Sequence, residues 1–215
     1  MRFLFVIFLI STTLVHAQLA FEFRWGMQKI IPGKTYYYKG DSIKFEELKA
    51  YLSDIYLKQN KEHTKIADVW LVDFEDPKNE LLNVKIQYGE SSNLSFNFGL
   101  DSIYHVNMEY TGKLDPIHGM YWAWNTGYIN FKLVARCSAV KLKNGLLDYH
   151  LGGYLKPNQT NQHLEFNFNG TTLFLDLLPL FEKGIIQPEL LPSVVLPGKE
   201  ANRLMKSLSS EIAYD

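Results

Sequence analysis

The stretch from Gly112 to Leu133, GKLDPIHGMYWAWNTGYINFKL, carries the densest structural signals in the sequence. In its first half, glycines and an Asp-Pro pair recur at short intervals, which predicts a series of turns. In its second half, residues 128–133 alternate apolar and polar side chains, which predicts a strand. Trp122 and Trp124 are two positions apart, so both rings would face the same side of an extended chain. A turn that delivers aromatic side chains and a histidine onto a strand predicts either a core segment or a binding site.

The composition predicts one folded, β-rich domain. The chain has 215 residues, of which 47% are hydrophobic and 14% aromatic, enough for a packed core. The formal net charge is −1, so no basic excess points to nucleic acid or to an anionic membrane surface.

The N-terminus has the pattern of a signal peptide. A positive start is followed by the apolar run of residues 3–10, and Val15 and Ala17 stand at the positions that signal peptidase reads. We therefore expect a signal peptide at residues 1–17, with cleavage before Gln18. The apolar run is too short to span a bilayer, so we expect a periplasmic or secreted protein.

About ten short runs of β-prone residues, separated by turn residues, predict a sandwich or barrel, and we expect an antiparallel β-sandwich. The runs Leu94–Phe98 and Leu164–Phe168 alternate cleanly, and Asn169-Gly170 after the second predicts a hairpin. Residues 43–57 fit both helix and strand, and we expect a helical turn at Phe45–Leu48 followed by a strand at Lys49–Leu57.

The C-terminal part differs in composition from the rest, because prolines recur in it. Residues 18–178 form the expected sandwich, and residues 179–215 form a proline-punctuated tail that packs on it. Within the tail, residues 198–213 carry apolar side chains at helical spacing, which predicts one amphipathic C-terminal helix.

The sequence contains no motif of a known catalytic site, so we expect a protein that is not an enzyme. Its histidines are the best candidate ligands for a metal site. His105 falls in a long loop that starts at Gly99, and His118 falls in the turn of the central stretch. His150 ends a strand just before Gly152-Gly153, glycines that would let a neighbouring group approach closely. Each histidine also has a plain structural explanation.

Other side chains leave two interpretations open. Cys137 is the only cysteine, which suits a buried, inert thiol better than a soft-metal ligand. Asp101 and Asp115 lie in turns where oxygen ligands for calcium could gather, although aspartate is also common as a turn former. Trp122 and Trp124 fit a sandwich core as well as the surroundings of a redox metal.

Several blocks of the sequence resemble the MbnP family, exported copper-binding proteins associated with methanobactin genes. The resemblance covers nearly all of the expected mature chain. The blocks are Phe98-Gly99-Leu100-Asp101-Ser102, Gly112-Lys113-Leu114-Asp115-Pro116, the run GMYWAWNTGYI from Gly119 to Ile129, Lys49–Leu57, and Tyr149-His150-Leu151-Gly152-Gly153.

This resemblance implies a β-sandwich that binds copper outside the cytoplasm. In the family the site uses histidines and, in some members, a tryptophan oxidised to kynurenine by a partner dihaem peroxidase-like enzyme. Carried over by position, His150 is the candidate ligand, and Trp122 or Trp124 is the candidate for oxidation.

One departure from the family pattern leaves two functions open, copper binding and a metal-free module. Family members often have a histidine on the first strand, where this chain has Phe23-Arg24-Trp25. His118 or His105 could take its place, although the motif supports neither. We therefore expect a copper-binding protein for acquisition, storage or handling of the metal. The alternative is a metal-free interaction or structural module, and a calcium-stabilised domain built on Asp101 and Asp115 ranks below both.

Overall fold

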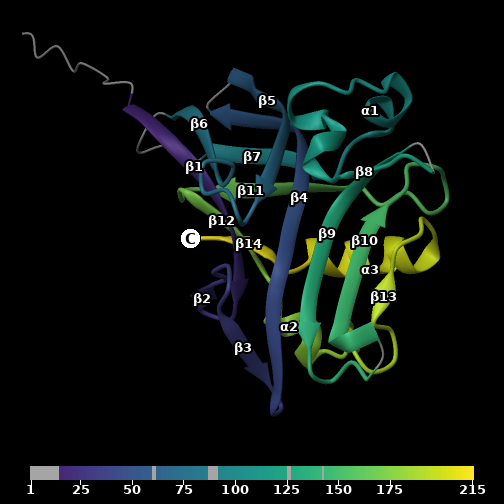
Figure 1. Ribbon diagram of the computed structural model, residues 1–215. Coiled ribbons are helices and arrows are strands. Elements are labelled where there is room, and N and C mark those ends of the chain that lie inside the picture. Colours follow the sequence, from purple (N-terminus) through teal and green to yellow (C-terminus); the bar gives the residue numbers. More distant parts are fainter. Residues whose placement is uncertain (1–14, 60–61, 87–91, 125–126, 142) are drawn as a thin grey trace, which may run out of the picture.

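One long strand, β4 (Asp41–Gln59), runs through the whole molecule and organises the larger of its two sheets (Figure 1). The structure, a computed structural model, describes residues 15–59, 62–86, 92–124, 127–141 and 143–215. Residues 1–14 of the expected signal peptide lie outside this range. Strand β1 begins at Val15, just ahead of the expected cleavage point.

Within the described residues, fourteen strands form two main sheets, here called the small sheet and the large sheet. The small sheet has the order β14 (Ile212–Tyr214), β12 (Thr172–Asp176), β1 (Val15–Trp25) and β2 (Gln28–Lys29), with β6 (Leu81–Ile86) also paired to β1. The large sheet has the order β11 (Gln162–Phe168), β7 (Ser92–Phe98), β4, β9 (Gly127–Cys137), β10 (Leu146–Gly152) and β13 (Ser193–Val194). Strands β3 (Thr35–Tyr38) and β5 (Glu62–Asp73) pair with β4, and β8 (Tyr121–Trp122) pairs with β9.

Strand β4 changes partners halfway along its length. On one edge, residues 43–50 pair with β9 and residues 52–59 pair with β7. Between these two halves, the Tyr51 carbonyl accepts a hydrogen bond from the Gly99 amide at 2.7 Å. The chain therefore leaves β7 at the point where the sheet divides, and residues 99–122 are free to cross over one face of it.

The main core fills the space between the two sheets. Alternation along β1 sends Phe21, Phe23 and Trp25 inward, where Phe23 meets Phe131 of β9 at a ring-centroid distance of 6.3 Å. Helix α3 (Lys199–Ser209) adds an apolar face to this core and lies against β10 and β11. Two shorter helices are α2 (Leu178–Glu182) and α1 (Ser102–Asn107), and three 3-10 turns are η1 (Gly112–Leu114), η2 (Pro116–His118) and η3 (Lys143–Gly145).

A second apolar cluster lies on the outer face of the large sheet, the face turned away from the small sheet. It is covered by the segment 99–122, which carries α1, η1, η2 and β8 (Figure 1). Two buried tyrosines fasten this segment to the sheet. The Tyr51 hydroxyl donates to the Lys113 carbonyl at 2.8 Å, and the Tyr128 hydroxyl reaches the Leu114 carbonyl at 3.1 Å. The first part of the central stretch, residues 112–122, is therefore part of a cap over the outer face, whereas Phe131 and Leu133 at its end belong to the main core.

The structure confirms a mainly β, sandwich-like fold but corrects its details. The expectation of about ten antiparallel strands is wrong: the described part of the chain has fourteen, and two pairs, β1–β12 and β10–β13, are parallel. The expected helical turn at Phe45–Leu48 is instead a register shift inside β4, between Phe45 and Glu47. The extra residue of this bulge separates the two buried side chains, Phe45 and Leu48, by three positions, which is the spacing that resembles a helical turn.

Three local predictions also change. The Asn169-Gly170 turn does not close a hairpin, because β11 belongs to the large sheet and β12 to the small one. The predicted C-terminal helix is present, but it ends at Ser209 so that β14 can join the small sheet. The expected loop after Gly99 contains the short helix α1.

Candidate functional site

A row of polar side chains crosses the outer face of the large sheet and ends at His150. The strand register places Asp73, Lys49, Lys132 and His150 side by side on β5, β4, β9 and β10. The lysines are paired with carboxylates: Lys49 Nζ lies 3.0 Å from Asp73, and Lys132 Nζ lies 2.8 Å from Glu47. His150 is thus next to a cation that is already partly neutralised.

His150 itself faces a carboxylate on its own strand. Its Nε2 lies 2.9 Å from Oδ1 of Asp148, and both side chains are about four-fifths buried, with 23% and 20% exposed. The ring N–H does not point along the line to the oxygen, so the contact is an electrostatic one and not a well-aligned hydrogen bond. The nearby carboxylate still favours a proton on Nε2 over one on Nδ1, and the Nδ1 lone pair is then the one left for a metal.

His118 lies over the same face but is oriented differently. Its carbonyl accepts a hydrogen bond from Lys49 Nζ at 3.3 Å, and Lys132 Nζ reaches the Gly119 carbonyl at 3.5 Å. The His118 ring turns back onto its own segment, where Nε2 contacts the Gly112 carbonyl at 2.9 Å. The two lysines therefore hold the turn on the sheet, while the imidazole of His118 stabilises the turn itself.

The two tryptophans of the central stretch lie together but differ in exposure. Their ring centroids are 5.6 Å apart, with Trp122 only 5% exposed and Trp124 63% exposed. Trp122 packs directly on Gly152, where a Cβ atom would come within 2.8 Å of the ring and 2.5 Å of the Tyr128 carbonyl. The close approach at Gly152 is therefore made by the protein itself, through the Tyr128 carbonyl and the Trp122 ring.

His105 occupies a separate, buried position. It lies in α1 with 1% of its surface exposed, and its ring stacks on Tyr154 at a centroid distance of 4.8 Å. Its Nδ1 accepts a hydrogen bond from the backbone amide of Tyr128 at 3.2 Å. Burial lowers the pKa of His105 to about 4, although the Asp101 carboxylate and the Leu100 carbonyl favour the charged form. The imidazole is therefore neutral at physiological pH.

His105 also lines a pocket of about 380 Å³, together with Trp122, Gly153 and Tyr154. A buried hydrogen-bond network holds both sides of this pocket. Asn130, fully buried on β9, accepts from the Leu100 amide at 3.0 Å and donates to Thr160 Oγ1 at 2.8 Å. Thr160 in turn donates to the Gly153 carbonyl at 3.0 Å. We call Asn130, Thr160 and their partners the Asn130 network.

The two aspartates considered for calcium have structural contacts. Oδ1 of Asp101 accepts from the Ile103 amide at 3.2 Å and begins α1, while Oδ1 of Asp115 accepts from the Ile117 amide at 2.9 Å and begins η2. Both are thus side chains that cap the start of a helix.

Across the described ranges, no three histidine, cysteine, aspartate or glutamate side chains gather in a group that could hold a metal ion. His150, His118 and His105 therefore do not form one three-histidine site. Position 24 of the first strand, near which relatives are expected to have a histidine, does not add a ligand to the outer face. Arg24 points away from the core on the small sheet, where its guanidinium lies 2.8 Å from Asp215 and over the Phe174 ring. Both sheets separate it from His150.

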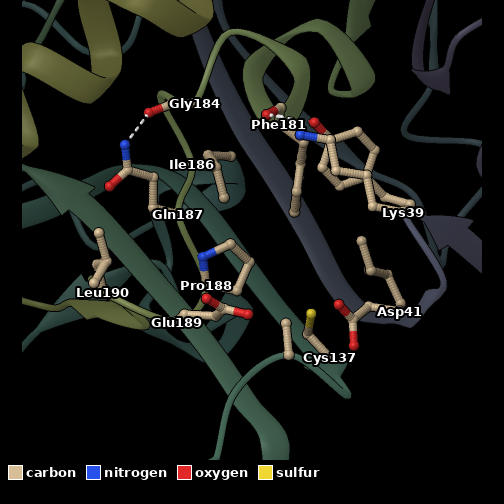
Figure 2. Close-up of a pocket in the computed structure, with 13 residues that line it drawn as sticks. Lys39, Asp41, Cys137, Phe181, Gly184, Ile186, Gln187, Pro188, Glu189 and Leu190 are labelled. Carbon is tan, nitrogen blue, oxygen red and sulfur yellow. Dashed lines mark hydrogen bonds between the residues drawn. The ribbon is translucent and has the colours of Figure 1, made fainter.

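A second pocket, of about 420 Å³, lies at the other end of the molecule between the start of β4 and residues 184–190 (Figure 2). Cys137 points toward it as a buried free thiol, and burial raises its pKa, which keeps the sulfur protonated. Asp41 and Glu189 lie at its rim (Figure 2). The arrangement suits the inert thiol and offers no group of soft ligands.

Sequence reasoning identified the histidines and tryptophans but missed the Asn130 network, the Tyr154 stack and both pockets. The signal nearest to them was Gly152-Gly153, since both glycines are close to neighbouring groups: Gly152 to Trp122 and Gly153 to Pro197.

Comparisons with known proteins agree with this fold. Residues 15–191 match the MbnP family. The solved structure of MbnP from Methylosinus trichosporium is similar, with a TM-score of 0.62, 19% sequence identity, and coverage of 79% of this chain and 78% of that chain. A search of curated proteins gave no match. In the described part of the chain, no helix is long and apolar enough to cross a membrane. The family match covers most of the sequence, and the chain belongs to the MbnP family.

Proposed function

We propose that this protein is an exported copper-binding protein of the MbnP type, with His150 as its principal ligand. The proposal is supported by family membership and by the position of His150 at the end of β10, beside the Gly152–Trp122 contact. The observation that carries it is the 2.9 Å contact between Nε2 and Asp148 Oδ1, which leaves Nδ1 as the nitrogen for a metal. Imidazole nitrogen suits both common oxidation states of copper.

The site that these residues fit is an open one. Without a group of three ligand side chains among the described residues, a copper ion at His150 would complete its coordination with water or with ligands brought by a partner. The Lys132 ammonium on the neighbouring strand would also repel a copper cation bound at His150. These features favour an exchangeable ion, so among acquisition, storage and handling we propose copper handling.

The exposure of the two tryptophans bears on the proposed partner. A dihaem peroxidase-like enzyme that oxidises a tryptophan would have to contact the ring, or a ring next to it. Trp124 is 63% exposed whereas Trp122 is 5% exposed, so we propose Trp124 as the site of contact and of modification. Mass spectrometry of peptides from protein purified from its native host, compared with a Trp124→Phe variant, tests this assignment.

A metal-free interaction module is the second candidate function, and specific observations favour it. The described residues offer no three-ligand group, and Arg24 is engaged with Asp215 at the strand where relatives often have a histidine. In that case the cap formed by residues 99–122 would serve as a binding surface.

Copper titration of the mature protein from Gln18, as Cu(I) and as Cu(II), separates these functions. The proposal predicts one equivalent bound by the wild type and lost in His150→Ala, with weaker binding in Asp148→Asn. His163→Ala is the matched control, because His163 is an exposed histidine on β11 of the same large sheet, where its Nδ1 lies 3.2 Å from Asn97 Oδ1. Absence of bound copper, or binding that His150→Ala leaves unchanged, would favour the metal-free module.

A further inference from the structure

The pocket beside α1 contains a hydrogen-bond donor without an acceptor. A backbone amide can only donate, so the hydrogen bond from Tyr128 to His105 Nδ1 leaves that nitrogen without a proton. In the neutral ring the proton must then be on Nε2. Nε2 is buried and makes no well-aligned hydrogen bond within the part of the chain that the structure describes, so the Leu100 carbonyl, which favours the charged ring, does not satisfy it. His105 therefore presents an N–H group and not a metal-binding lone pair.

The ring is held in this orientation from three sides. Tyr154 stacks on it with an interplanar angle of 21°, and Tyr128 packs edge-on at a centroid distance of 5.7 Å. The Asn130 network fixes the two chain segments that carry His105 and Tyr154. A donor that is fixed before the ligand arrives loses little conformational entropy on binding. Such unsatisfied buried donors are uncommon in folded proteins and call for a partner.

The other residues of the pocket indicate the chemistry of that partner. Besides His105 and Tyr154, its polar side chains among the described lining residues are Lys156 and Asn158, and none of these described residues is an aspartate or glutamate. Its apolar walls are the ring of Trp122, Leu155 and Pro197. A cation, an amide and a neutral N–H favour a carboxylate, and the walls favour an apolar body. The volume of about 380 Å³ is within the usual range for small-ligand sites.

We propose that this pocket binds a small carboxylate with an aromatic or branched apolar body, whose oxygen accepts a hydrogen bond from His105 Nε2. Because Nε2 is buried, the half-buried Tyr154 side chain shifts as the ligand enters. Lys156 stabilises the charge at the rim, and Trp122 contacts the apolar body. The site does not use His150 and is independent of copper binding.

The experiment uses the mature protein in buffer that contains a metal chelator, so that failure of the copper proposal does not affect it. Phenylacetate and indole-3-acetate are titrated by calorimetry, with phenylacetamide as the uncharged analogue and acetate as the analogue without an apolar body. A second arm uses a short peptide that ends in phenylalanine, as the free acid and as the amide. The first arm tests a free metabolite and the second tests a chain terminus.

We expect at least one aromatic acid to bind about tenfold more tightly than its amide, and acetate to bind more weakly than either. His105→Phe should reduce the affinity about tenfold, whereas His105→Gln, which keeps an acceptor and a donor, should retain part of it. Lys156→Gln should weaken binding severalfold, and the control His163→Ala should not change it. Circular dichroism and thermal unfolding verify that each variant is folded.

Three results would overturn the proposal. One is that no acid binds in either arm. Another is that the acid and its amide bind equally well. The third is that folded His105→Gln and Lys156→Gln variants both bind the acid as the wild type does, which also decides the matter if His105→Phe does not fold.

Discussion

His150 and His105 lie in the same family fold yet offer opposite chemistry. His150 is on a strand of the large sheet with Nε2 beside a carboxylate, so its remaining nitrogen offers a lone pair. His105 is on a short helix above that sheet with Nδ1 occupied by a backbone amide, so its remaining nitrogen offers a proton. The comparison shows that residue type alone does not define a metal ligand. The group that holds the other ring nitrogen decides what an imidazole can bind.

Breaking the Asn130 network should produce the largest difference between the His105 pocket and the His150 site. Asn130→Ala leaves the buried Leu100 amide without its acceptor and removes the donor to Thr160 Oγ1, and we expect a loss of about 4 kcal/mol in the free energy of unfolding. Because the network holds the His105 pocket, carboxylate binding should be lost while copper binding at His150 persists. Urea unfolding and the two titrations measure these effects.

Thr160→Val is the matched variant, because it removes one end of the network and leaves the Leu100 amide satisfied by Asn130. Thr160→Val should lower the free energy of unfolding by clearly less than Asn130→Ala does. Equal losses of stability in the two variants would show that the network does not act through Asn130.

The second-largest effect should be the contribution of His105 to the pH dependence of the free energy of unfolding. The pKa of His105 is lowered from 6.5 to about 4 in the folded state by burial, so the unfolded chain binds the proton first as pH falls. The contribution of His105 to stability is therefore complete above pH 6.5 and is lost as pH decreases to about 4. The loss should be on the order of 3 kcal/mol.

His105→Gln should remove this part of the pH dependence, whereas His163→Gln should leave it in place. The measurement is urea unfolding at several values between pH 4 and pH 7, analysed as the difference between each variant and the wild type. An unchanged slope in His105→Gln would contradict a neutral, buried His105.

Gly152→Ala should affect both regions, because Trp122 packs on Gly152 and also lines the His105 pocket. The added Cβ would lie 2.5 Å from the Tyr128 carbonyl and 2.8 Å from the indole, and we expect a loss of about 2 kcal/mol. Trp122 fluorescence and thermal unfolding report the change.

Gly112→Ala provides the contrast, because its Cβ would meet nothing within 4 Å and only its positive φ of 57° opposes the change. It should cost less than Gly152→Ala and leave the Trp122 environment unaltered. The reverse order would indicate that the space at Gly152 is not limiting.

The smallest effect should come from the lysine beside His150. Lys132→Met removes a positive charge next to the proposed copper ion and frees Glu47 from its 2.8 Å ion pair. Copper affinity should rise about fivefold, the effect of roughly 1 kcal/mol between partly solvated charges. Carboxylate binding at the His105 pocket should not change, and weaker copper binding in this variant would argue against a site at His150.

The sequence predicted those parts of the fold that depend on local pattern. The alternation in Leu94–Phe98 corresponds to β7, and the apolar spacing of Ala201, Leu204, Met205 and Leu208 corresponds to the buried face of α3. These elements bury one face each, so a repeat of two or of about 3.6 residues is enough to define them.

The remaining features depend on contacts between distant residues. No local pattern shows that β4 exchanges β9 for β7, or that β11 and β12 belong to different sheets despite the turn between them. The proton position on His105 is set by an amide 23 residues further along the chain. His150 became the candidate ligand because a family motif contains it, whereas Asn130 and Tyr154 become visible only when the segments that they join are placed together.

The most direct test of the difference between the two histidines is a long-range nitrogen–proton NMR spectrum of the labelled mature protein near neutral pH. We predict that His105 gives the pattern of a neutral ring with its proton on Nε2, and that sub-stoichiometric Cu(II) broadens the signals of His150 while those of His105 persist. A proton on Nδ1 of His105, or broadening of His105 ahead of His150, would contradict the account.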